Sequence, residues 1–190
     1  MTVKINADTT NGAVITSDTS GEIELQAGGT KIATVKSTGL EMASGKDLNP
    51  RVPAFQARRS GTSQSITAST WTKLQYQTEV FDTHSLYDNA TNYRFTPDVA
   101  GYYHINLGAR ADGTNKAVMT ISIYKNGVAY SYSNRRYASS GAEYLAHSTV
   151  LYLDGVDDYV EGYINITGAT NATVAPVAQA SALSGYLVSI

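Results

Sequence analysis

The 190-residue chain contains no cysteine, so a disulfide framework, a thiolate metal site and a cysteine nucleophile are all excluded. Charged residues make up only 16% of the chain and the formal net charge is −2, which provides no basic surface for nucleic acid or anionic lipid. No apolar run reaches the roughly eighteen residues that a membrane helix needs. The N-terminus does not resemble a signal peptide. We therefore expect neither a nucleic-acid partner nor insertion into a membrane.

Aromatic residues are confined to one part of the chain. No aromatic residue precedes Phe55, although the chain contains fourteen tyrosines, three phenylalanines and one tryptophan. Pro50 and Pro53 stand just before this point, and proline favours extended geometry in the residue ahead of it. The sequence thus predicts a β-rich segment, a linker and a separate domain, over residues 1–46, 47–53 and 54–190.

The segment before the linker has the pattern of short strands. Ile23 and Leu25 alternate with polar residues, and the pair Gly28-Gly29 is typical of a turn. A segment with so few large apolar side chains cannot bury a core alone. We expect it to bury its apolar stripe against copies of itself, the alternative being an unstructured linker.

The rest of the chain contains one strand pattern after another. Alternating residues from Val118 to Tyr124 lead into Asn126-Gly127, the strongest short-range signal for a β-hairpin. Asp154-Gly155 indicates another turn, and no stretch has a helical period with caps. The spacing of the strands predicts an all-β sandwich or jelly roll.

Residues suited to catalysis do not gather in any known pattern. His84, His104 and His147 fall in different predicted elements, and the chain lacks a Gly-x-Ser-x-Gly nucleophile elbow. We expect no catalytic residue, no cofactor and no enzymatic activity.

One acidic cluster, formed by Asp154, Asp157 and Asp158, offers oxygen ligands of the kind that calcium prefers. The same residues also suit a turn, because aspartate side chains accept hydrogen bonds from the backbone that follows them. The turn is the favoured interpretation, and a calcium site is the alternative.

Arg135, Arg136 and Tyr137 form the candidate receptor contact. Arginine offers a planar fork for carboxylates or sugars, and tyrosine offers a ring for stacking. The alternative is an ordinary solvated loop.

The run from Phe95 through Gly101 and Tyr103 to Ile105 resembles the signature of the complement C1q-like globular head. Further segments resemble that family's strands and follow in the family's order, among them Trp71–Leu74, Ile121–Gly127, Leu151–Val160 and Ser181–Leu187. The resemblance spans residues 53–190. It implies a ten-stranded jelly roll, shared with the tumour-necrosis-factor (TNF) family, that assembles as a homotrimer.

Five residues of these motifs are candidates for the trimer interface, with the subunit's own core as the alternative place for them. They are Tyr102, Tyr103, Ile105, Tyr186 and Leu187. Tyrosine suits an interface because its ring can be buried while its hydroxyl stays hydrogen-bonded.

Residues 15–35 are similar to segments of bacteriophage tail and head fibres, and the chain lacks the Gly-X-Y stalk usual in animal C1q proteins. Together these features predict a subunit of a homotrimeric virion fibre or spike. Its N-terminal part would dock on other virion proteins, and its C-terminal knob would be displayed on the particle surface to bind a host glycan or protein. The alternatives are a capsid decoration or fibre protein with a structural role only, and a bacterial surface adhesion protein.

Overall fold

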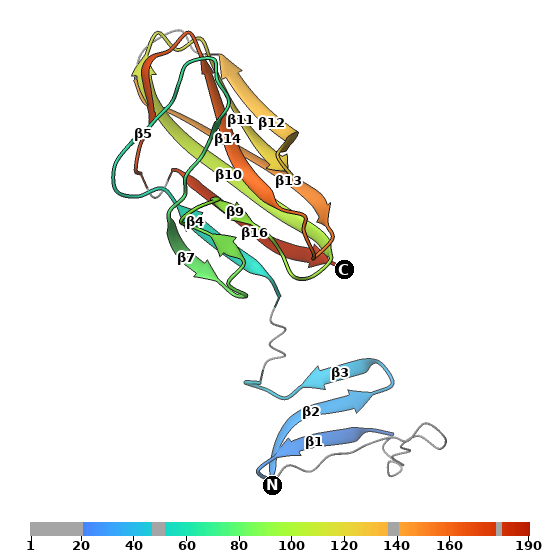
Figure 1. Ribbon diagram of the computed structural model, residues 1–190. Helices are drawn as coiled ribbons and strands as arrows, with labels where there is room; N and C mark the ends of the chain where they lie inside the picture. The colour runs from blue at the N-terminus through green and yellow to red at the C-terminus, as the bar shows by residue number, and fades with distance from the viewer. Residues whose placement is uncertain (1–20, 47–51, 137–140, 178–179) are drawn as a thin grey trace. The chain divides into compact units, whose positions relative to one another are not determined.

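The computed structural model contains only strands and loops among the residues it describes, which confirms the all-β prediction (Figure 1). Those residues are 21–46, 52–136, 141–177 and 180–190. Within these ranges there is no helix that could span a membrane. The chain divides into two compact units, residues 1–50 and residues 51–190.

The first unit contains a three-stranded antiparallel sheet in chain order, made of β1 (Ile23–Ala27), β2 (Thr30–Lys36) and β3 (Gly39–Met42). Gly28 and Gly29 form the first turn with φ angles of 58° and 74°. Glycine adopts this left-handed conformation without steric cost, so the pair closes the two-residue hairpin that the sequence predicts.

The two faces of this small sheet differ sharply. Pairing across the strands places Leu25 with Ala33 and Val35 with Leu40 on one apolar face, on which Leu25 and Leu40 remain about half exposed. The opposite face is ionic, because Lys36 forms salt bridges with Glu22 and Glu41, the first of them 3.7 Å long. In the described part of this unit, Leu25, Val35 and Leu40 of the apolar face therefore remain exposed.

The second unit is a sandwich of two antiparallel sheets. The first sheet has the order β5-β15-β10-β16-β4-β7, with β13 paired to the other side of β10. Its strands are β4 (Ala54–Arg58), β5 (Gln64–Ser65), β7 (Thr78–Asp82), β10 (Gly101–Thr114), β13 (Glu143–Leu153), β15 (Thr170–Val174) and β16 (Ala182–Ser189).

The second sheet has the order β12-β11-β14-β9-β8, with β6 paired to β14. Its strands are β6 (Thr72–Lys73), β8 (Tyr87–Asp88), β9 (Arg94–Phe95), β11 (Val118–Lys125), β12 (Val128–Arg136) and β14 (Val160–Thr167). The described residues of this unit thus form thirteen strands where the resemblance implies ten, and four of the thirteen have only two residues. The predicted hairpin at Asn126-Gly127 joins β11 to β12, with φ angles of 52° and 76° at the two turn residues.

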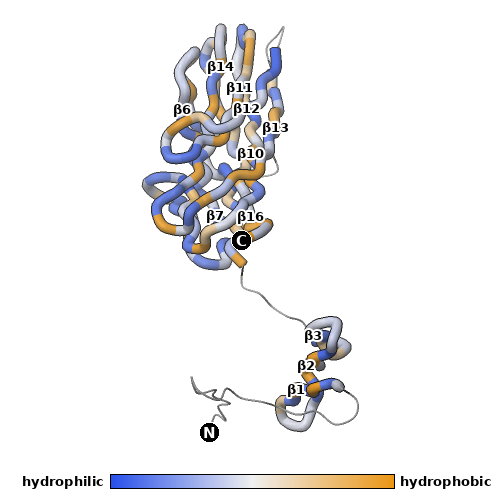
Figure 2. Tube along the Cα trace, turned by 90° about the vertical axis from the view of Figure 1, so that its right-hand side faces the viewer, coloured by the Kyte–Doolittle hydropathy of each residue, from blue (hydrophilic) through white to orange (hydrophobic). Residues whose placement is uncertain are grey.

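The core lies between the two sheets and is rich in aromatic rings. Phe55 stacks on Phe95 with ring centroids 4.3 Å apart, and Tyr103 meets Phe95 edge-on. Gly185 on β16 makes this packing possible: a Cβ there would lie 2.5 Å from Ile105 Cδ1 and 3.0 Å from the Phe55 ring. Figure 2 shows apolar and polar residues alternating along the strands, as expected for sheets with one buried face.

Candidate interaction face

Successive side chains of β10 and β16 point to opposite sides of the sheet, so the five predicted interface residues lie in two environments. Tyr103 and Ile105 point into the sandwich and are fully buried, so they belong to the core of the subunit itself. Leu187 is partly buried and packs against that core. Tyr102 and Tyr186 point the other way and are 52% and 48% exposed. Of the five candidates, these two lie where a second protein chain could reach them.

Outward side chains of the first half of β10, and of the parts of β13 and β16 that pair with it, form a surface that we call the tyrosine face. Strand register sets its members opposite one another: Tyr102 pairs with Tyr152, and His104 lies between Val150 and Tyr186. The next row contains Asn106, Ser148 and Ser184. None of these eight residues is an aspartate, glutamate, lysine or arginine.

Ring contacts order the aromatic end of the tyrosine face. Tyr102 meets Tyr152 edge-on at 5.5 Å between centroids, and His104 meets Tyr186 in the same way at 5.4 Å. Beyond the polar row the surface becomes hollow, because the residues that pair there are small: Gly108, Ala146 and Ala182. The hollow has a volume of about 450 Å³. The surface therefore combines projecting rings with a depression that could receive side chains of a partner.

Sequence reasoning did not identify Tyr152, Val150 and His104 as members of this face. A signal for Val150 and Tyr152 existed in the period-two pattern of 143–153, where Tyr144, Val150 and Tyr152 occupy alternate positions of one strand. Their alignment with Tyr102 and Tyr186 depends on the register of β13 and β16 against β10, which one strand's sequence does not specify.

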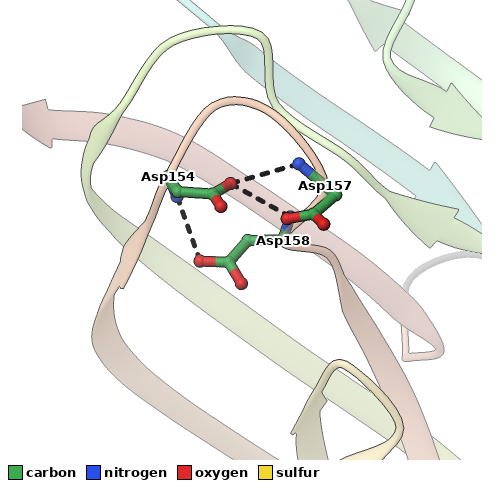
Figure 3. A group of neighbouring side chains, drawn as sticks. All are labelled: Asp154, Asp157 and Asp158. Atoms are coloured by element: carbon green, nitrogen blue, oxygen red, sulfur yellow. Dashed lines mark hydrogen bonds between the residues drawn. The ribbon is translucent and has the colours of Figure 1, made fainter.

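The three aspartates of the acidic cluster form a hydrogen-bonded turn between β13 and β14 (Figure 3). Asp154 Oδ1 accepts hydrogen bonds from the backbone N–H groups of Val156, Asp157 and Asp158 at 2.9–3.2 Å. These bonds lower the pKa of Asp154 to about 2. Asp158 accepts a bond from the Asp154 N–H and pairs with Lys125 at 2.7 Å. The residues thus come together as a turn, and calcium binding stays an untested alternative.

The proposed receptor contact falls at the end of β12. Arg135 and Arg136 are both exposed, but they pair with Met119 and Val118 and so lie on opposite faces of the strand. Tyr137 lies outside the described residues. The two arginine side chains therefore do not form one joint contact surface on the strand.

The three histidines lie in separate places, as predicted. His84 Nδ1 is 3.0 Å from a carboxylate oxygen of Asp98, and His147 Nε2 is 2.6 Å from Ser131 Oγ. The histidine–serine contact and the histidine–aspartate contact thus involve different histidines. Burial lowers the pKa of His147, which favours its neutral form between β12 and β13.

Comparison with solved structures identifies the architecture. The globular domain of zebrafish complement 1qA matches with a TM-score of 0.52 at 18% identity, covering 72% of this chain and 97% of that domain. Eiger TNF from S. frugiperda matches with a TM-score of 0.57 at 6% identity, covering 73% of this chain and 93% of its own. Murine APRIL matches with a TM-score of 0.57 at 12% identity, covering 72% and 99%.

The second unit has the C1q/TNF-like jelly-roll fold. This confirms the fold that the signature from Phe95 to Ile105 implied. No family model and no curated protein sequence matches the chain, so the likeness concerns the fold.

Proposed function

We propose that the protein is a subunit of a homotrimeric bacteriophage fibre or spike. In this proposal the jelly roll forms a distal knob for attachment to the host surface, and the N-terminal part docks on the particle. The protein acts by adhesion, with no bond made or broken.

The tyrosine face is the main observation that supports a trimeric assembly. Tyr102, Tyr152 and Tyr186 are each about half exposed on a single subunit. Each ring therefore leaves a large apolar area in water, and covering that area would stabilise an assembly. Contiguous exposed aromatic surface of this kind marks interaction sites. None of the eight side chains of this face is an aspartate, glutamate, lysine or arginine, so three copies can meet on them without bringing carboxylates or ammonium groups of like charge together.

The sheet of the first unit supports the same assembly. Its apolar face, with Leu25, Val35 and Leu40, cannot be covered by the ionic face of the same sheet. Three copies that bury these faces together would form a short shaft of the kind suggested by the resemblance of residues 15–35 to phage fibres. The phage origin, the docking on the particle and the host-surface role rest on that sequence resemblance.

The full chain tests the proposal in two steps. Light scattering is expected to give three times the mass of the 20.3 kDa chain, and a monomer across the accessible concentration range would refute the trimer. Purified protein is then expected to bind bacterial host cells and to compete with infection. A trimer that is found in particles but neither binds cells nor competes would support a purely structural decoration instead.

A further inference from the structure

The outer side of the second sheet carries a separate aromatic cluster, which we call the Trp71 platform. It consists of Trp71, Lys73, Tyr124, Glu161 and Tyr163. Core residues such as Ile121 and Ile164 occupy the inner side of the same strands, so the platform and the tyrosine face lie on opposite sides of the sandwich. A trimer built on the tyrosine face would leave the platform exposed outward on each subunit.

Three rings form the surface of the platform. Tyr124 stacks on Tyr163 with centroids 4.0 Å apart, and Trp71 meets Tyr124 edge-on at 5.8 Å. Trp71 is 41% exposed and is the only tryptophan of the chain. The rings come from three segments, β11, β14 and the residue before β6, which the sheet brings together.

An ion pair beneath the rings holds the platform in place. Glu161 points outward from β14, yet its side chain is only 4% exposed and forms a salt bridge with Lys73. The Lys73 ammonium also donates to the Asn92 carbonyl at 3.3 Å and lies 5.9 Å from the Tyr163 ring centroid. Burial and the Glu161 carboxylate raise the pKa of Tyr163 to about 12, so its hydroxyl stays a hydrogen-bond donor.

The chemistry of this surface suits a carbohydrate better than a protein partner. Sugars present C–H faces that stack on aromatic rings and hydroxyl edges that need polar partners, and the platform offers both kinds of contact. The next outward row of the sheet is polar, with Thr120 opposite Asn165, where a protein interface would favour apolar anchors in its centre. On the neighbouring strand β12, exposed Tyr132 adds a further ring on the same side. Ordered rings also reduce the entropy lost on binding.

We propose that the Trp71 platform is a carbohydrate-binding site through which the knob contacts host-surface polysaccharide. This inference rests on the proposed host-attachment function and names its ligand class. Three platforms on one trimer would bind a repeating polysaccharide with avidity, so that weak single contacts suffice.

The experiment uses the full chain on an array of purified bacterial lipopolysaccharides and capsular polysaccharides. A saccharide that binds is then titrated while the fluorescence of Trp71 is recorded, because this residue alone supplies the tryptophan emission. We expect a shift in emission on binding and protection of Trp71 from acrylamide quenching. Trp71→Ala has no tryptophan emission, so its affinity is measured by a dilution series on the array, where it should bind about tenfold or more weakly, as truncation of an aromatic anchor does.

Two variants separate a lost contact from a lost fold. Trp71→Phe keeps a stacking ring and should retain most of the binding. Phe81→Ala removes a similarly exposed aromatic side chain from β7, at the edge of the other sheet, and should bind like the unsubstituted protein. Far-UV circular dichroism checks that each variant is folded.

The possible results separate failure of the proposed binding site from failure of the proposed attachment function. Saccharide binding that Trp71→Ala leaves unchanged would overturn the site. A second result would refute the carbohydrate ligand and keep the attachment function. In that case the trimer binds host cells but no saccharide, and protease treatment of the cells abolishes this binding whereas periodate treatment does not. A chain that is monomeric refutes the proposed trimer, whereas the array still decides whether the platform binds sugar.

Discussion

The replacement Tyr186→Lys tests whether the tyrosine face holds the subunits together. The Tyr186 side chain is 48% exposed on one subunit. Since a tyrosine buries roughly 200 Å² when fully covered, association would remove about 100 Å² of it from water. At about 25 cal/mol per Å² this contributes about 2.5 kcal/mol per subunit, or about 7.5 kcal/mol for three copies. We expect the trimer dissociation constant to rise by about five orders of magnitude.

Sedimentation velocity over a dilution series measures this change. Tyr132→Lys is the matched control, because Tyr132 is 63% exposed on β12, where its pairing with Ser122 places it on the outer side of the second sheet, opposite the tyrosine face. This control should dissociate at the same concentration as the unsubstituted protein. If Tyr186→Lys remained a trimer at equal dilution, the tyrosine face would not be the interface.

Three further predictions concern the jelly roll itself. Residues 51–190 expressed alone should fold, because the core cluster forms wholly within that unit, and an unfolded circular dichroism spectrum would contradict this. Gly185→Ala should lower the free energy of unfolding by about 1–3 kcal/mol in urea, since its Cβ would overlap Ile105. Burial lowers the pKa of His147 below 6.5, so the unfolded chain binds the proton more readily than the folded chain. Stability should therefore decrease as the pH falls below about 6.5, and His147→Gln should reduce this decrease.

The strands and turns of this protein were predictable because their signals are local. The alternation at 118–124 and the pair Asn126-Gly127 specify a hairpin from adjacent residues, as do Gly28-Gly29 in the first unit. The signature from Phe95 to Ile105 also indicated the jelly roll, which the solved structures confirm.

The functional surfaces depended on contacts between distant segments. Tyr102 and Tyr103 are neighbours in one motif, yet one is exposed and the other is in the core, because successive side chains of a strand point to opposite faces. The same alternation separates Arg135 from Arg136. A motif carried over from a family names both neighbours and does not say which of them faces solvent.

The sequence by itself determined that this chain is all-β, where its hairpins turn, and that its aromatic residues belong to one part of it. These properties follow from the residues' own backbone preferences and from the period of their polarity. Only the tertiary structure decided that Tyr102, Tyr152 and Tyr186 share one face and that Trp71, Tyr124 and Tyr163 share another. Strand register and sheet order bring these residues together, and both are set by packing across the whole sandwich.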